Sequence, residues 1–246
     1  MRDDINRSMV VARSALSGGQ RDEMYQLLDA HFAGVTRDRF EGDLSEKDWV
    51  ILVMQGNRLV GFSTMLAYEA ICDDQPVSVI YSGDTIMARD AWGSTALPRA
   101  WIDTVNGLRD LHPRGGFYWL LLTSGFRTYR FLSVFWRMFW PRFDRATPPA
   151  SKRLLDQLAA ERFGNQYDPA AGVVRFRQPQ RLRRELVEVP AGRVEDPHVA
   201  CFLARNPGHA RGDELVCLTD LSSENMTPAG RRMLGARIHG AVISHR

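Results

Sequence analysis

The chain has 246 residues, of which 44% are hydrophobic and 25% are charged. This length suits one large domain or two small ones, and the composition excludes a chain that is disordered or collagen-like throughout. No apolar run reaches the roughly 18 residues that a membrane-spanning helix needs.

Localisation can be inferred from the N-terminus and from the cysteines. The first residues, Met1–Arg7, are charged and no apolar stretch follows them, so no secretion signal is expected. The three cysteines, Cys72, Cys201 and Cys217, are an odd and sparse set. Together these features predict reduced thiols and a cytoplasmic protein.

The formal net charge of +3 is unevenly distributed along the chain. Residues 1–74 hold 8 basic and 13 acidic side chains, whereas residues 75–246 hold 24 basic and 16 acidic ones. The basic part favours an anionic partner, such as a phosphorylated cofactor, an acidic carrier protein or a nucleic acid. A surface whose charges are merely solvated is the alternative.

Hydrophobic periodicity predicts a strand, a helix and then three strands joined by tight turns in the first 87 residues. Gly56-Asn57 is a hairpin signal between two of these strands, so the three form an antiparallel meander. The predicted elements are a strand and turn over Met9–Ser17, a helix over Arg21–Gly34, an irregular segment or short helix over Thr36–Asp48, and strands over Trp49–Gln55, Arg58–Ile71 and Val77–Met87.

A helix over Ser94–Asp110 follows, and then a strand over Phe117–Thr123 whose unbroken apolar run indicates burial on both faces. Because the helix returns the chain, this strand is expected to lie parallel to the third meander strand. A second apolar helix over Arg127–Trp140 is expected to stop at Pro141.

The C-terminal part starts with a proline-rich linker, Thr147-Pro148-Pro149, and its elements are less regular. The segment 181–189 is ambiguous. The predicted elements are helices over Ser151–Phe163, His198–Ala204 and Thr227–Ser244 and strands over Val173–Arg177 and Glu214–Leu221.

The element order over Met9–Trp140 resembles the GNAT superfamily of N-acyltransferases. The resemblance implies an α/β fold of the α+β type with a mixed sheet, in which residues 1–145 form a GNAT-like core. Residues 146–246 would be a C-terminal extension that packs on the core and completes the sheet. In this family the third meander strand and the strand after the crossover helix splay apart, and an acyl-thioester cofactor lies in the gap.

The resemblance also implies where the donor binds, because the family holds the pyrophosphate on backbone amides where the crossover helix begins. The segment after the third strand has one glycine, Gly93, and carries Trp92 where the family usually has arginine. This departure keeps open a longer acyl group, an acyl carrier protein as donor in place of coenzyme A, or a plain structural turn. The expected cofactor-binding residues are Met87, Ala88, Arg89, Gly93, Ser94, Thr95, Ser124 and Arg127.

Acyl transfer to an amine needs a base, and Asp84 is the first candidate because a carboxylate inside an apolar strand needs a reason. Pairing with an arginine is the alternative. Glu69 is the second candidate, unless it simply faces solvent. Tyr129 is the candidate acid for the leaving thiolate, and its alternative is a buried tyrosine with a satisfied hydroxyl. His31 is expected in the core.

The segment Phe126–Phe143 holds eight aromatic residues and four arginines. Two apolar stripes on this helix indicate burial on two sides, or contact with an acyl chain, a partner or a membrane surface. No nucleic acid is expected, because stacking aromatics normally lie on exposed strands or loops. The histidines and cysteines lack the spacing of a metal site, so no metal is expected.

The resemblance therefore implies an N-acyltransferase. It would move an acyl group from acyl-CoA (acetyl or longer) or an acyl carrier protein to an amine by direct attack, with a small-molecule or lipid-like acceptor. The alternative is a non-catalytic module on the same fold that binds an acyl thioester or a lipid, at a membrane surface if the aromatic helix contacts one.

Overall fold

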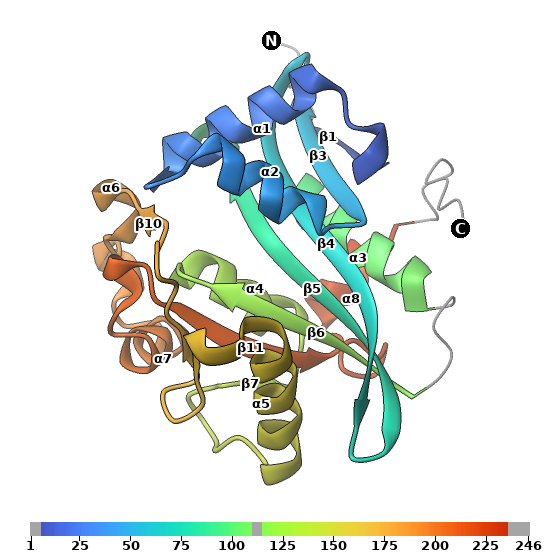
Figure 1. Ribbon diagram of the computed structural model, residues 1–246, viewed down its shortest axis with the longest axis vertical. Coiled ribbons are helices and arrows are strands. Elements are labelled where there is room, and N and C mark those ends of the chain that lie inside the picture. Colours follow the sequence, from blue (N-terminus) through green and yellow to red (C-terminus); the bar gives the residue numbers. More distant parts are fainter. Residues whose placement is uncertain (1–5, 110–114, 236–246) are drawn as a thin grey trace.

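The computed structural model describes residues 6–109 and 115–235. Within these ranges a mixed sheet runs through the molecule in the order β1-β3-β4-β5-β6-β11-β9-β8, and β7 pairs with β11 beside this path (Figure 1). A separate two-stranded sheet joins β10 to β2. The strands are β1 (Arg7–Ala12), β2 (Phe32–Ala33), β3 (Trp49–Gln55), β4 (Arg58–Cys72), β5 (Gln75–Met87), β6 (Gly116–Thr123), β7 (Phe139–Trp140), β8 (Tyr167–Asp168), β9 (Val173–Val174), β10 (Arg181–Leu182) and β11 (Glu214–Asp220).

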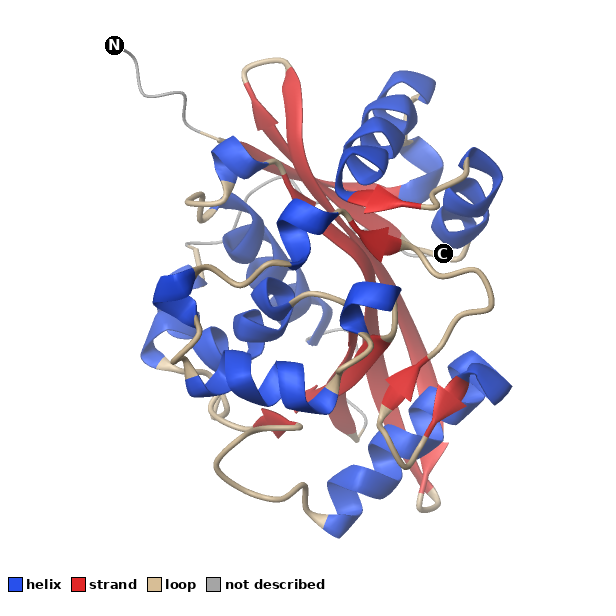
Figure 2. Ribbon diagram, turned by 90° about the vertical axis from the view of Figure 1, so that its left-hand side faces the viewer, coloured by secondary structure: helices blue, strands red, loops and turns tan. Residues whose placement is uncertain are grey.

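Helices cover both faces of the main sheet, as Figure 2 shows. One face carries α3, α4, α7 and α8, and the other carries α1, α2 and α5. None of the helices in the described ranges is long and apolar enough to cross a membrane. The helices are α1 (Gly18–His31), α2 (Arg37–Ser45), α3 (Ala96–Arg109), α4 (Phe126–Phe135), α5 (Pro149–Phe163), α6 (Arg184–Val187), α7 (Pro197–Arg205) and α8 (Pro228–Met233).

The three-strand meander predicted from the sequence is confirmed. Strands β3, β4 and β5 pair antiparallel in order, with Ile51 opposite Ser63 and Ile80 opposite Ala67. The strand predicted over Trp49–Gln55 has the same bounds as β3. Apolar side chains alternate between the two faces of the sheet, so each face supplies a separate hydrophobic core.

A β-bulge interrupts the pairing of β4 with β5. Ser63 lies opposite Thr85 and Met65 lies opposite Ser82, so Thr64 alone faces both Gly83 and Asp84. A Cβ atom on Gly83 would lie 2.8 Å from Thr64 Oγ1 and 2.9 Å from Lys47 Cε, so the bulge needs glycine here. Bulges bend a strand and change the direction of its side chains. This bulge places the Asp84 carboxylate where β5 stops pairing with β6.

Helix α3 returns the chain so that β6 lies parallel to β5, as the sequence predicted. The two strands pair from Val77 with Gly116 to Ser82 with Leu121. Past these residues β5 continues beside β4 and β6 continues beside β11, and no pairing joins them to each other. The expected divergence of the two strands at their ends is therefore confirmed.

The C-terminal part adds strands to the same sheet. Strand β11 pairs antiparallel with β6 along Leu215–Asp220, and β9 and β7 pair with β11. Helix α5 packs on the face that carries α1 and α2. Strand β10 pairs with β2 next to the end of α1.

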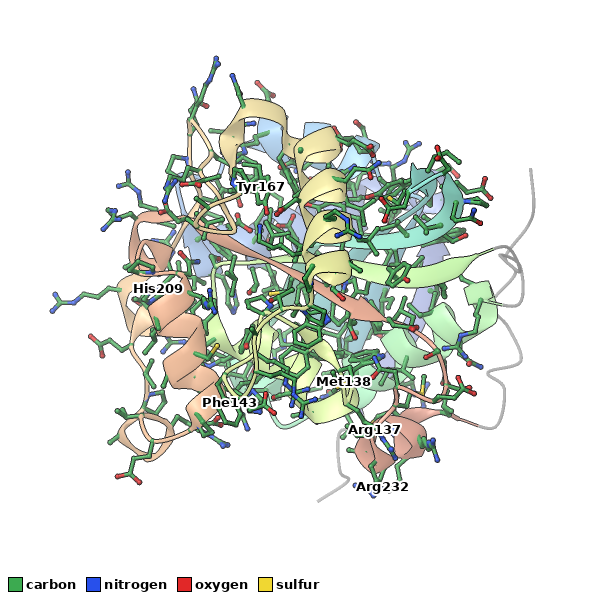
Figure 3. The ribbon with its side chains drawn as sticks, turned by 90° about the horizontal axis from the view of Figure 1, so that it is seen from below. Arg137, Met138, Phe143, Tyr167, His209 and Arg232 are labelled. Atoms are coloured by element: carbon green, nitrogen blue, oxygen red, sulfur yellow. The ribbon has the colours of Figure 1, made fainter. Side chains whose placement is uncertain are left out.

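The apolar helix predicted over Arg127–Trp140 is shorter in the structure. It ends at Phe135, because Trp136 takes extended backbone angles (φ −123°, ψ 143°) and bridges to Met226. Phe139 and Trp140 then pair with β11 as β7. In Figure 3, Arg137 and Met138 lie near α8, on which Arg232 is labelled.

The C-terminal helix predicted over Thr227–Ser244 is also shorter. Helix α8 ends at Met233, and Leu234 already has extended backbone angles. The rest of the predicted helix, from residue 236 onward, lies outside the described residues.

Candidate functional site

A cavity of about 550 Å³ lies where β5 and β6 diverge, on the face that carries α3 and α4. We call it the α3-side cavity. Residues from the ends of both strands, from the first turns of both helices and from β10 and α6 line it. Its lining includes Asp84, Thr85, Met87, Trp92, Ser94, Leu97, Trp101, Trp119, Leu122, Ser124, Phe126, Arg127, Phe131, Phe135, Leu182, Leu186, Arg193 and Glu214.

A second cavity, of about 530 Å³, lies on the opposite face of the sheet. We call it the α5-side cavity. Helices α2 and α5 and strands β4 and β5 line it mainly with charged and polar side chains. These are Arg39, Asp43, Glu46, Lys47, Thr64, Tyr81, Asp84, Glu161, Arg162, Gln166, Gln180 and Glu214.

Four residues line both cavities: Gly83, Asp84, Leu122 and Glu214. We call this set the junction. It lies where β5 and β6 stop pairing, and its residues border a cavity on each face of the sheet. Two molecules bound on opposite faces would therefore both contact the junction.

Asp84 is half-buried on the bulge of β5. Burial raises the pKa of its carboxyl to about 6, and nearby Asp43 raises this pKa further, whereas Lys47 and Arg39 lower it. Among the described residues no arginine forms an ion pair with this carboxylate. The alternative considered from the sequence, in which Asp84 pairs with an arginine, is therefore not observed in this part of the chain. The carboxylate is therefore free to exchange a proton with a ligand near neutral pH.

Glu214 is the second junction carboxylate, and its role was not anticipated from the sequence. It is the first residue of β11, and burial raises the pKa of its carboxyl to about 8. The neighbouring Asp84 raises this pKa too. Two titratable groups whose pKa values are pushed apart in this way are suited to separate base and acid roles.

Only the placement of β11 beside β6 could have identified Glu214. The sequence showed a carboxylate at the start of a predicted strand, which is a common and unremarkable position. Which strand Glu214 adjoins depends on a pairing between residues more than ninety positions apart, such as Leu215 with Thr123. Sequence periodicity does not encode that pairing.

Lys47 lies at the junction on the α5 side. Its side chain is buried, its Nζ atom donates a hydrogen bond to the Asp43 carbonyl at 2.7 Å, and its Cε lies against Gly83. Burial lowers the pKa of this ammonium group, and Arg162 lowers it further. A buried cation next to the gap can stabilise negative charge that develops on a reacting carbonyl oxygen.

The donor-binding residues expected from the sequence divide into two groups. Those that line the α3-side cavity are Met87, Ser94, Ser124 and Arg127. Those that do not line it are Ala88, Arg89, Gly93 and Thr95. A Cβ atom on Gly93 would meet nothing within 4 Å, so no close approach requires glycine there.

Helix α3 presents few free backbone amides to an anion. The Ala96 amide donates to Ser94 Oγ at 3.1 Å, and the Arg99 amide donates to the Thr95 carbonyl at 3.0 Å. Pro98 has no amide hydrogen. The expected cradle for a pyrophosphate at this helix is thus mostly occupied.

Helix α4 offers a better N-terminus for an anion. Its N-cap, Gly125, makes no side-chain capping bond, and the cavity is lined by Phe126, Arg127 and Thr128 from the first turn. The Arg127 guanidinium lies 4.3 Å from the centroid of the Trp92 ring and donates to the Leu186 carbonyl at 3.0 Å. Arginine beside free amides suits a phosphate group.

Residues 181–193, which we call the strap, border the α3-side cavity. Leu182, Leu186 and Arg193 line the cavity from the strap. The strap is held to the core by β10 pairing with β2 and by Arg183, whose guanidinium donates to the Asp29 carbonyl at 2.7 and 2.9 Å.

The end of β5 is fixed by two rings at the mouth of the cavity. Trp92 Nε1 donates to the Met87 carbonyl at 2.8 Å, and His31 Nε2 lies 3.0 Å from the same oxygen. His31 lies half-buried in the lining of the cavity, not deep in the core as expected.

Tyr129 does not face the cavity, which corrects the expectation that it protonates a thiolate. Its side chain is fully buried between Phe139 and Phe202, and its hydroxyl donates to the Pro141 carbonyl at 2.8 Å. Burial raises the pKa of this hydroxyl far above its ordinary value. The alternative reading of a buried tyrosine with a satisfied hydroxyl is the correct one.

Glu69 is also outside both cavities. It is exposed and pairs with Ser78 on β5. Ser78 precedes Asp84 by six residues, so Glu69 lies roughly 20 Å along the sheet from the junction. Its position contradicts a role as the base.

No family model matches the sequence, and no curated protein matches it either. Similar solved structures include a probable N-acyltransferase from Enterococcus faecalis V583, with 14% identity and a TM-score of 0.42 over 57% of this chain. They also include a GCN5-related N-acetyltransferase from Kribbella flavida, with 14% identity and a TM-score of 0.39 over 54% of this chain. Escherichia coli ElaA has 19% identity and a TM-score of 0.37 over 58% of this chain and 93% of its own.

The chain spans 37% of the Enterococcus protein and 34% of the Kribbella protein. These likenesses are partial and distant. The fold is therefore described from features of this chain itself, namely the antiparallel meander, the crossover helix α3 and the divergence of β5 from β6.

Proposed function

We propose that this protein is an N-acyltransferase that uses an acyl thioester as donor and an amine as acceptor. The observation that carries the proposal is the junction, where two cavities on opposite faces of the sheet meet at two carboxylates. The donor would occupy the α3-side cavity, and the acceptor would enter from the α5-side cavity.

Coenzyme A is the donor carrier that we favour, with an acyl carrier protein as the alternative. The phosphates would bind Arg127, Arg193 and the first turn of α4, because α3 has few free amides. The pantetheine arm would lie between the ends of β5 and β6, whose facing edges make no hydrogen bonds to each other. These residues fit the carrier, although the glycine-rich cradle typical of the GNAT superfamily is lacking.

The α5-side cavity favours a cationic acceptor. Arg162 pairs with Glu46 at 2.8 Å and Arg39 approaches Asp43 at 3.8 Å, so these charges largely cancel. What remains near the junction is Lys47 against Asp84 and Glu161, with Glu214 as the neutral acid. The remaining carboxylates outnumber this one cation, and such an excess attracts a protonated amine.

In the proposed reaction the bound ammonium group first loses one proton to solvent. The neutral amine nitrogen then attacks the thioester carbonyl carbon, and a carbon–nitrogen bond forms. Asp84, as the carboxylate, takes the proton from that nitrogen. The Lys47 ammonium stabilises the charge on the carbonyl oxygen. The carbon–sulfur bond then breaks, and Glu214, as the carboxylic acid, gives its proton to the departing thiolate. The products are an amide and a free thiol, and no covalent enzyme intermediate forms.

Thermal unfolding with added coenzyme A tests the donor site. At a hundredfold excess over Kd, a ligand that binds only the folded chain adds about 2.7 kcal/mol. For a chain of this size we expect Tm to rise by about 5–10 °C. Arg193→Ala should weaken binding by about tenfold or more, because a hydrogen bond to a charged group contributes about 1.5–3 kcal/mol.

Arg184→Ala is the matched control, because Arg184 is on the same strap but its side chain is 94% exposed and does not line the cavity. It should leave the affinity for coenzyme A unchanged. A shift seen only with an acylated carrier protein would assign the carrier. If coenzyme A, acetyl-CoA and an acylated carrier protein all leave Tm unchanged, the donor site does not exist.

A further inference from the structure

The α3-side cavity does not end at the junction. It continues along the α3 and α4 face toward the paired part of β5 and β6, where Trp119 contributes to its lining. Trp119 precedes the junction residue Leu122 by three residues, which is about 10 Å along a strand. Along α4 the lining runs from Phe126 to Phe135, which is about 14 Å of helix.

Four aromatic side chains form a continuous wall in this inner part of the cavity: Trp101, Trp119, Phe131 and Phe135. The ring centroids of Trp101 and Trp119 lie 4.2 Å apart, and those of Phe131 and Phe135 lie 4.6 Å apart. Phe131 joins the two pairs through an edge contact with Trp119 at 5.8 Å. We call these four residues the aromatic wall.

The aromatic wall is held in place from behind. Trp136 packs against Trp101 at 5.6 Å and against Trp119 at 5.2 Å, and Trp136 is 1% exposed. Trp119 Nε1 donates to the buried Ser82 hydroxyl at 2.8 Å, so its one polar group is satisfied. Trp101, Trp119 and Phe135 are buried and form a fixed apolar boundary, and the half-buried Phe131 has the most surface to offer to an apolar group.

We propose that the inner part of the α3-side cavity binds an apolar acyl group longer than acetyl, seated against the aromatic wall. This inference rests on the proposed function, because it places the reacting thioester at the junction. From there the acyl chain has one apolar direction to follow, along α4 and away from the charged α5-side cavity. An acetyl group has one carbon beyond the carbonyl and would leave the aromatic wall without a partner.

Calorimetric titration with coenzyme A and with acetyl-, butanoyl-, hexanoyl-, octanoyl- and phenylacetyl-CoA tests the inference. Each added methylene should tighten binding by about fourfold, which is the affinity equivalent of about 0.8 kcal/mol, until the cavity is full. A comparison of phenylacetyl-CoA with octanoyl-CoA shows whether an aryl group or an aliphatic chain binds better against the aromatic wall.

Two variants place the effect at the aromatic wall. Phe131→Ala enlarges the cavity, so the gain in affinity should extend to longer chains than in the wild type. Leu97→Trp narrows it, so the gain should stop at shorter chains when each affinity is expressed relative to that of the same variant for coenzyme A. Val134→Ala is the matched control, because Val134 is on the same helix but is 38% exposed and outside the lining.

The outcomes separate the inference from the function that it rests on. Equal affinity for all acyl-CoA chain lengths, with coenzyme A still bound, would overturn the acyl subsite and leave the proposed function standing. A chain-length series that neither Phe131→Ala nor Leu97→Trp alters would overturn its placement at the aromatic wall. Failure of every coenzyme A species to bind would overturn both.

Discussion

Replacing Asp84 by asparagine should lower the rate of acyl transfer by about 10²–10⁴-fold, the usual contribution of one general base. The amide keeps the size of the side chain but cannot accept the proton of the attacking amine. Donor affinity should survive, because the phosphates are proposed to bind Arg127, Arg193 and the first turn of α4, and the amide keeps the size of the side chain beside the thioester. The rate of thiol release and the affinity for acyl-CoA are measured on the same variant.

Glu69→Gln is the matched control for Asp84→Asn. It makes the same carboxylate-to-amide change on the neighbouring strand β4, at an exposed position outside both cavities. It should keep full activity. Full activity in Asp84→Asn would instead remove Asp84 from the chemistry. If the protein only binds the thioester, neither the wild type nor Glu69→Gln would show turnover.

Replacing Glu214 by glutamine should lower the rate by about 10²-fold or more and change its dependence on pH. In the wild type the rate should rise as Asp84 loses its proton near pH 6 and fall as Glu214 loses its proton near pH 8. These two values belong to the coupled pair of carboxyls. Without Glu214 the fall at high pH should disappear, because no acid is left to titrate.

Stability provides a second measurement on Glu214→Gln. The pKa of Glu214 is raised in the folded chain, so its contribution to stability is present below its unfolded pKa and is lost as pH rises through about 8. The glutamine does not titrate. The Tm of the variant relative to the wild type should therefore increase between pH 5 and pH 9, and a constant difference would show that Glu214 is not buried as described.

The sequence predicted the sheet well where hydrophobic periodicity and turn signals agreed. The meander and the crossover helix follow from local patterns and from the handedness of crossovers. The divergence of β5 from β6 was expected only from the resemblance to the GNAT superfamily. The extent of α4 could not be predicted, because the aromatic residues before and after Phe135 have the same helical spacing in the sequence. Its end at Phe135 is imposed by pairing of the next residues with Met226 and β11.

The candidate site was only partly predictable for the same reason. Asp84 was visible because a carboxylate within an apolar strand is unusual. Glu214 and Lys47 reach the junction through strand pairing and helix packing over long sequence distances, and neither stood out in its local segment. Tyr129 was wrong as the acid, because its face of α4 packs against α7 and not against the gap.

The most direct test of the site is a crystal structure of the protein with a non-reactive thioether analogue of acyl-CoA. We expect the pantetheine arm between the ends of β5 and β6, with the sulfur at the junction beside Asp84 and Glu214 and the phosphates near Arg127 and Arg193. An analogue bound outside the α3-side cavity, or with its sulfur remote from the junction, would contradict the proposed acyl transfer.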